Sequence, residues 1–180
     1  FRDFEVLEDV ASGEAIFPLF RKETPDILLL DISLPGRSGL EVLKQIQSMY
    51  PKVAVLALSM YPEDQFAIRM IKAGARGYLH KDSAPEILEE AMRTIVEGKQ
   101  YISAELTRLM IEEMAKGDNE LPHKSLSDRE YEVLLYIGEG KTMTEIANQL
   151  SLSIKTVSTY RSRILEKMRL KSNSDLVKYI

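Results

Sequence analysis

Hydrophobic and polar positions follow two alternating periods along the first hundred residues. Short apolar runs predict strands at Phe4–Val10, Ile27–Asp31, Val53–Ser59 and Gly77–Lys81. Between them, apolar residues recur at the spacing of a helical turn, near Gly13–Glu23, Gly39–Tyr50, Pro62–Ala73 and Pro85–Glu97. The strand at residues 27–31 is apolar up to its last residue, which is typical of a parallel strand buried on both faces. We therefore expect an α/β domain with a parallel sheet over residues 1–98.

The pattern changes after Gly98 and becomes helical to the end of the chain. Residues 99–124 contain one expected helix, Ala104–Lys116, and a polar stretch, and we interpret them as a partly helical linker. The remaining segment predicts helices at Ser127–Ile137, Thr142–Leu150, Ile154–Met168 and Asn173–Ile180. Residues 125–180 are therefore expected to form an all-α domain of four helices.

Composition narrows the class of protein. The hydrophobic share of 44% and the charged share of 29% are those of ordinary globular proteins, so wholesale disorder is unexpected. The absence of cysteine excludes disulfides and thiolate metal sites. No apolar run approaches the length of about 20 residues that crosses a bilayer, and the first residues do not resemble a signal peptide. We expect a cytoplasmic protein without a membrane partner.

Charge is distributed unevenly along the chain. Residues 1–124 carry 15 basic and 21 acidic side chains, whereas residues 125–180 carry 9 basic and 7 acidic ones. The segment 155–171 alone holds six basic residues and one acidic residue. An acidic body with a short basic segment suggests that only the C-terminal domain meets a polyanion, although basic faces are often merely solvated surface.

Three polar residues fall at the carboxyl ends of predicted strands. In open α/β sheets, ligands bind outside these ends. The carboxylate of Asp31 could attack phosphorus, the hydroxyl of Ser59 could hydrogen-bond a phosphoryl oxygen, and Lys81 could neutralise its charge. Each residue alone would more simply be a turn cap or a solvated side chain, but their shared position favours a phosphoryl site.

The same segments resemble the receiver domain of response regulators over roughly residues 4–98. The resemblance rests on three blocks, which are Pro25-Asp26-Ile27-Leu28-Leu29-Leu30-Asp31-Ile32-Ser33-Leu34-Pro35-Gly36 with Gly39, Leu56-Ala57-Leu58-Ser59, and Lys72-Ala73-Gly74-Ala75-Arg76-Gly77-Tyr78-Leu79-His80-Lys81. It implies a flavodoxin-like fold in which Asp31 is phosphorylated by a sensor histidine kinase. It further implies that Ser59, Tyr78 and Lys81 respond to the phosphoryl group.

The resemblance also implies Mg²⁺ bound by Asp31, the Ser33 carbonyl and a pair of acidic residues. In the family these acidic residues follow a first strand that lies mid-sheet, and this chain contains neither that strand nor the helix after it. We therefore expect the chain to be part of a longer protein. Glu8 and Asp9 fall on a different predicted strand and are not expected to replace the pair.

The C-terminal helices carry the features of a helix-turn-helix. Ser127 followed by Glu130 predicts a capping box, and the tight turn Ser151-Leu152-Ser153 joins two helices. Along the second of these helices we expect a core stripe consisting of Ile154, Val157, Ile164, Leu165 and Met168. Spacing alone would equally allow a helical bundle that binds another protein.

The segment resembles the LuxR-type DNA-binding domain through Asp128-Arg129-Glu130, Glu132-Val133-Leu134, Glu145-Ile146-Ala147 and Lys155-Thr156-Val157. Together with the receiver, it is identified as a member of the NarL/FixJ response regulators. The resemblance implies base contacts by Ser158, Thr159 and Ser162, and phosphate contacts by Lys155, Thr156, Tyr160, Arg161 and Arg163. Tyr160 departs from the histidine common in relatives. A homodimer on double-stranded DNA, joined through residues 173–180, is also implied.

Two other functions compete with a phosphorylation-gated DNA-binding regulator. A small phosphatase or hydrolase would use Asp31 as its nucleophile, but it also needs a positioned general base, and none is evident in the sequence. A degenerate receiver would serve dimerisation only and leave DNA binding constitutive. We expect a regulator rather than an enzyme.

Overall fold

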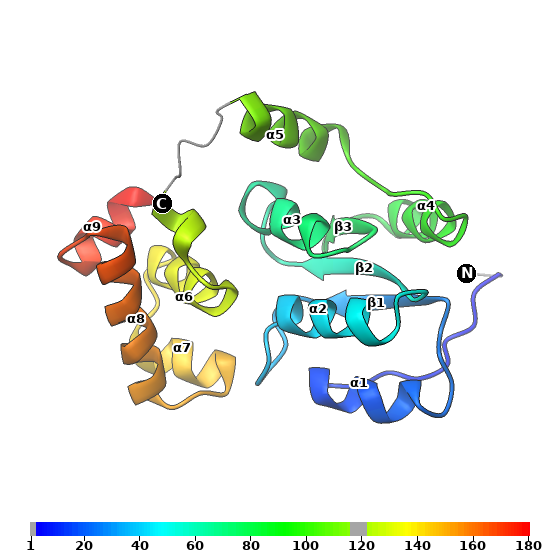
Figure 1. Ribbon diagram of the computed structural model, residues 1–180, viewed down its shortest axis with the longest axis horizontal. Coiled ribbons are helices and arrows are strands. Elements are labelled where there is room, and N and C mark those ends of the chain that lie inside the picture. Colours follow the sequence, from blue (N-terminus) through cyan, green and yellow to red (C-terminus); the bar gives the residue numbers. More distant parts are fainter. Residues whose placement is uncertain (1–2, 116–121) are drawn as a thin grey trace. The chain divides into compact units, whose positions relative to one another are not determined.

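The structure, a computed structural model, describes residues 3–115 and 122–180, apart from the side chain of Gln65. The chain divides into two compact units (Figure 1). The first contains strands β1–β3 and helices α1–α5, and the second contains the 3₁₀ turn η1 and helices α6–α9. Among the described helices, none combines the length and apolarity that crossing a membrane would require.

A parallel sheet forms the centre of the first unit. Its strands are β1 (Ile27–Asp31), β2 (Ala54–Ser59) and β3 (Gly77–His80), in the order β1-β2-β3. The register pairs Leu29 with Leu56 and Leu56 with Gly77, so all three strands end at the same edge. The predicted parallel α/β architecture is confirmed, and the three predicted strands in it begin or end within one residue of the observed bounds.

Helices cover both faces of this sheet. The crossovers α2 (Gly39–Met49) and α3 (Glu63–Lys72) lie on one face, because right-handed βαβ connections place successive helices on the same side. Helix α1 (Gly13–Phe20) packs beside α2 (Figure 1). Helix α4 (Pro85–Val96) packs on all three strands from the other face. Its contact with the sheet is a buried cluster of Leu56, Leu79, Ala91, Met92 and Ile95.

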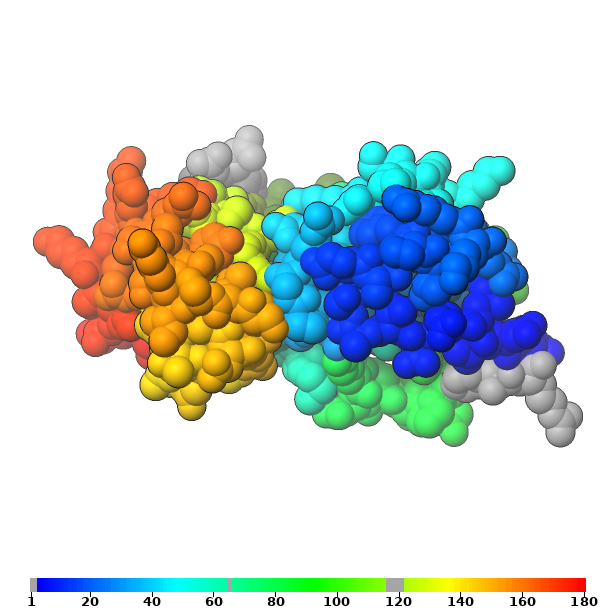
Figure 2. All heavy atoms as spheres, turned by 90° about the horizontal axis from the view of Figure 1, so that it is seen from below, coloured from blue at the N-terminus to red at the C-terminus, as the bar shows by residue number. Residues whose placement is uncertain are grey.

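The strand predicted at Phe4–Val10 is wrong. These residues form no strand, and Val6 and Leu7 are 83% and 45% exposed. An extended run becomes a strand only where a neighbour pairs its backbone groups, and β1 pairs with β2 alone among the described strands. The segment instead lies on the outside of the first unit, where Figure 2 shows the N-terminal residues in blue.

Helix α5 (Ala104–Ala115), predicted within the linker, packs on α3. Leu106 is fully buried, and Lys72 of α3 forms an ion pair with Glu113 at 2.9 Å. The hydroxyl of Ser103 caps α5 by accepting from the Leu106 backbone N–H at 2.9 Å, and it donates to Glu63 at the start of α3. The predicted end of this helix at Lys116 and the linker residues 116–121 lie outside the described part of the chain.

The second unit is all helical. It consists of η1 (Pro122–Ser125), α6 (Asp128–Gly138), α7 (Met143–Leu150), α8 (Ile154–Met168) and α9 (Asn173–Tyr179). The capping box predicted at Ser127 and Glu130 is confirmed, and similar boxes start α7 and α9. Helix α6 is buried along most of its length and contacts α8 and α9.

The expected core stripe of α8 is correct in three of its five residues. Val157, Ile164 and Met168 are buried, and Leu165 is half-buried. Ile154 is 51% exposed, so its placement in the core was wrong. Ile154 is the first residue of α8. The nearest buried residues along the chain are Leu150, at the end of α7, and Val157, one turn further along α8.

Candidate functional site

The carboxyl edge of the sheet brings together two of the three predicted phosphoryl-site residues by direct contact. The ammonium Nζ of Lys81 lies 2.5 Å from Oδ2 of Asp31, and each side chain is about one-third exposed. The other carboxylate oxygen, Oδ1, accepts the backbone N–H of Ser33 at 2.9 Å. Because parallel strands end side by side, residues fifty positions apart share one solvent-accessible site.

Ser59 ends the strand between these two residues and is fully buried. Its hydroxyl accepts the backbone N–H of Tyr61 at 2.8 Å, and its carbonyl accepts the N–H of Lys81 at 2.7 Å. The side chain of Ser59 thus holds the turn that leads into α3. Within the described part of the chain, the Ser59 hydroxyl bonds to the Tyr61 backbone and not to Asp31.

Two side chains of β3 fasten the same turn. The buried Tyr78 donates its hydroxyl to the carbonyl of Tyr61 at 2.8 Å. His80 places Nε2 2.9 Å from the carbonyl of Met60. The contacts of Tyr61 and His80 were not anticipated from sequence, because they depend on the path of a loop whose residues carry no periodic signal. The loop after β2 is therefore connected to the strand that precedes Lys81.

Glycine shapes the loop that follows Asp31. A Cβ added to Gly39 would lie 2.4 Å from the Cα of Ile32, and its backbone N–H donates to the Ile32 carbonyl at 3.1 Å. Gly36 has a φ of +80°, which favours glycine. Ser38 then starts α2 with a capping box to Glu41. The loop returns close to the end of β1 because no side chain stands in the way.

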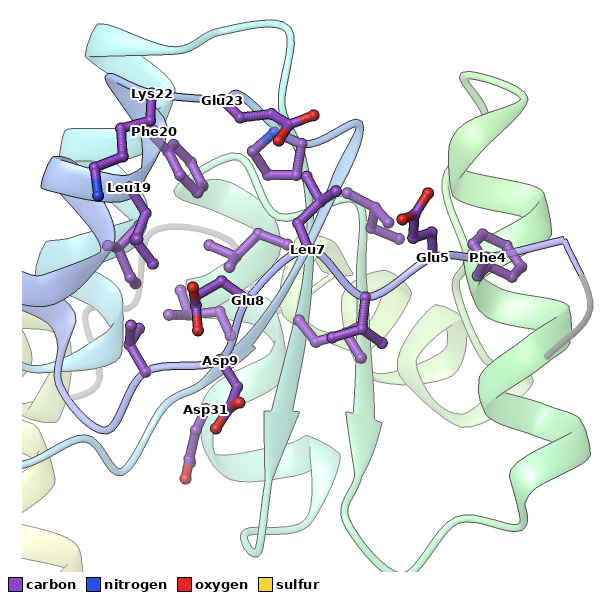
Figure 3. A pocket seen from close by; sticks show the side chains of 18 of the residues that line it. Phe4, Glu5, Leu7, Glu8, Asp9, Leu19, Phe20, Lys22, Glu23 and Asp31 are labelled. Atoms are coloured by element: carbon purple, nitrogen blue, oxygen red, sulfur yellow. The ribbon is translucent and has the colours of Figure 1, made fainter.

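A cavity of about 550 Å³ opens beside the unpaired edge of β1 (Figure 3). Residues 4–10 line one side of it and residues 27–31 the other, and Asp9 and Asp31 both belong to its lining. Among the described residues, no group of three histidine, cysteine, aspartate or glutamate side chains could hold a metal ion. Asp31 and the Ser33 carbonyl supply at most part of the near-octahedral oxygen shell that Mg²⁺ requires, so the described residues do not by themselves fit that ion.

Helices α7 and α8 form a helix-turn-helix in the second unit. They contact each other, and Ser151 with a φ of +53° makes the sharp turn between them. Ser153 starts α8 by accepting the backbone N–H of Thr156 at 3.0 Å. In Figure 2 these two helices, coloured yellow to orange, form much of the visible face of this unit.

The residues predicted to contact DNA lie on α8 outside its buried stripe of Val157, Ile164 and Met168. Five of them are exposed, namely Lys155, Ser158, Thr159, Ser162 and Arg163. The other three are half-buried, namely Thr156, Tyr160 and Arg161. The hydroxyls of Thr159 and Ser162 donate to backbone carbonyls one turn earlier, at 2.9 and 3.0 Å. Their oxygen lone pairs consequently point outward as acceptors.

Two of the basic residues of α8 have partners within the unit. Nε of Arg161 donates to Oδ1 of Asn173 at 2.5 Å, which ties α8 to α9. Lys167 lies 2.6 Å from Glu130, a 3% exposed carboxylate at the start of α6. Burial alone would raise the pKa of Glu130, but hydrogen bonds from Lys167 and Ser127 outweigh it and hold this pKa below its ordinary value. Lys167 therefore has a structural role that its place in the basic segment did not reveal.

Comparison with protein families covers both units. The family "Response regulator receiver domain" matches residues 2–93, and "Bacterial regulatory proteins, luxR family" matches residues 124–180. The chain is 35% identical over 185 residues to the oxygen regulatory protein NreC of Staphylococcus epidermidis, covering 98% of this chain and 85% of the relative. This chain belongs to the two-component response regulators of the luxR family.

Other proteins similar to this response regulator include a second curated relative and two solved structures. NreC of Staphylococcus aureus (strain NCTC 8325) is 34% identical, again over 98% of the chain and 85% of the relative. A structure of RcsB from Salmonella enterica serovar Typhimurium, bound to the promoter rprA in the presence of the phosphomimetic BeF₃⁻, has a TM-score of 0.62 at 26% identity, with 97% and 84% of the two chains covered. A luxR-family regulator from Aurantimonas sp. has a TM-score of 0.56 at 31% identity, over 61% of this chain and 79% of the other.

Proposed function

We propose that phosphorylation of Asp31 by a sensor histidine kinase promotes binding of the second unit to promoter DNA as a homodimer. The observation that carries this proposal is the contact of Asp31 with Lys81 at 2.5 Å on the accessible carboxyl edge of the sheet. A carboxylate oxygen of Asp31 would attack the phosphorus of a phosphohistidine, and the P–N bond electrons would return to the histidine nitrogen. Lys81 would then balance the charge of the acyl phosphate.

Ser59 would couple phosphorylation of Asp31 to a change in the loop that follows β2. Its hydroxyl is occupied with the Tyr61 backbone, so a hydrogen bond to a phosphoryl oxygen would require the turn of residues 59–61 to rearrange. Tyr78 and His80 hold two carbonyls of this turn and would rearrange with it. Mg²⁺ would assist phosphorylation only where further acidic oxygens join Asp31 and the Ser33 carbonyl. We assign no catalytic turnover to this receiver, and we place the protein in the cytoplasm with its DNA and kinase.

Affinity for DNA tests this proposal directly. The operator is first mapped by genome-wide binding, and the full-length protein is then titrated with it before and after treatment with a small phosphodonor. We expect the phosphodonor to tighten binding of the wild type, and to leave Asp31→Asn unchanged. Equal affinities in both states would favour the alternative, a receiver that dimerises only and a DNA-binding unit that acts constitutively.

Some exposed residues of α8 would contact the DNA phosphates and others the edges of the bases. Arg163→Ala is expected to weaken binding to all sequences alike and to reduce the slope of log affinity against log salt by about 0.9, because one phosphate contact is lost. Thr159→Ala or Ser162→Ala should instead change which operator sequence is preferred. Each lost base contact should reduce the discrimination against the wrong base by about 1–3 kcal/mol. Titrations at several salt concentrations separate the two effects.

Lys99→Ala provides the matched control, since it removes an exposed cation from the first unit and should leave the slope unchanged. The orientation proposed for α8 is wrong if Arg163→Ala alters sequence preference while the Thr159 and Ser162 variants only rescale affinity.

A further inference from the structure

Ile154 is a large apolar side chain in an otherwise polar and basic setting. It is 51% exposed, although the pattern of α8 assigned it to the core. Ser158 and Ser162 follow it at spacings of four and eight residues and are also exposed, so the three lie along one stripe of the helix. Ile154 therefore heads the stripe whose next two members are proposed to contact bases.

Its place at the start of α8 is the second observation. Ile154 directly follows the N-cap Ser153, so it belongs to the first turn of the second helix of the helix-turn-helix. In this architecture the second helix enters the major groove, and its N-terminal residues approach the base edges. An exposed isoleucine elsewhere on the surface needs no explanation, but one on this face would lose its water when DNA binds.

The major groove offers one apolar group, the 5-methyl of thymine. Ser162 presents an oxygen acceptor and Lys155 a cation, and the methyl group of Thr159 is a much smaller apolar surface than the side chain of Ile154. We infer that Ile154 is a specificity residue that selects thymine by packing on its methyl group. This inference rests on the proposed function, since it requires that α8 enter the major groove.

Replacing thymine by uracil tests the contact without altering any hydrogen bond. In the mapped operator, each thymine is exchanged for uracil in turn, and the affinity of the full-length protein is measured. Burying one methyl group corresponds to a change in affinity of about 3- to 5-fold. We expect a loss of this size at one thymine in each half-site, and near-identical affinity at all others.

Variants of Ile154, combined with the uracil operators, form a double-mutant cycle that isolates the contact of Ile154 with the methyl group. Ile154→Ala should bind the thymine operator about 3- to 10-fold more weakly and should no longer distinguish thymine from uracil at that position, whereas Ile154→Val should retain part of the discrimination. Val96→Ala, a comparable truncation of a 50% exposed residue on α4 of the first unit, is the control and should keep the full thymine preference.

The outcomes separate the two proposals. An operator that binds equally well with uracil at every position, or an Ile154→Ala variant with unchanged thymine preference, would overturn the assignment while leaving DNA binding intact. A protein that binds no DNA sequence selectively would instead contradict the proposed function. Loss of DNA affinity without any dependence on the methyl group would also overturn the assignment, because Ile154 would then support binding without recognising thymine.

Discussion

Asp31→Asn is expected to abolish phosphate uptake. In a protein that includes the first strand and the acidic pair implied by the resemblance, supplied with Mg²⁺ and a small phosphodonor, the wild type should gain one phosphoryl group on Asp31. The amide of asparagine keeps the shape of the side chain but is not a nucleophile, so no acyl phosphate can form. Mass spectrometry of the intact protein and of the peptide that contains residue 31 measures the gain directly.

Asp26→Asn is the matched control for this experiment. Asp26 immediately precedes β1 at the amino edge of the sheet and is exposed, so the same substitution there should leave phosphate uptake at the wild-type level. Phosphate retained by the Asp31→Asn variant would show that another residue is the acceptor.

Glu132→Ala should destabilise the second unit strongly. The guanidinium of Arg129 lies 2.5 Å from Glu132, and the two side chains are only 6% and 4% exposed. Removing one member of a buried ion pair costs about 3–5 kcal/mol, because the desolvated charge of the other loses a group that helps to balance it. Hydrogen-exchange mass spectrometry of peptides from α6 gives the free energy of opening for this unit alone.

Glu139→Ala provides the comparison at the end of the same helix. Glu139 pairs with Lys141 at 2.8 Å, but the two side chains are 39% and 31% exposed, so the expected loss is at most about 1 kcal/mol. Similar values for the two variants would mean that the pair of Arg129 and Glu132 contributes no more than a surface contact.

Sequence predicted the elements best where local chemistry marks their ends. The bounds of α8 follow from the tight turn at residues 151–153 and the apolar stripe that ends at Met168, and β1 follows from an apolar run bounded by polar residues. The strand predicted at Phe4–Val10 failed because a strand depends on a neighbour, which its own residues do not encode. The prediction that Ile154 lies in the core was wrong because a helical period does not say whether the first residue of the helix lies over the core.

The candidate site was predictable to a similar degree. The meeting of Asp31 and Lys81 follows from the rule that parallel strands end at one edge, and the structure brings the two side chains into contact. The roles of these residues came from the resemblance to receivers and stay predictions. The contacts of Tyr61 and His80 could not be predicted, because the path of a short loop is set by tertiary packing rather than by periodicity.

The packing of α5 on α3 bears on how separable the receiver is. Leu106 is fully buried on a surface that belongs to the receiver, and Ser103 and Glu113 bond to the two ends of α3. A receiver excised before α5 would carry an uncovered apolar patch on α3 and would be prone to self-association. The functional module that can be transplanted onto another output domain therefore extends through residue 115. A chimera joined upstream of α5 would lack the helix that covers α3.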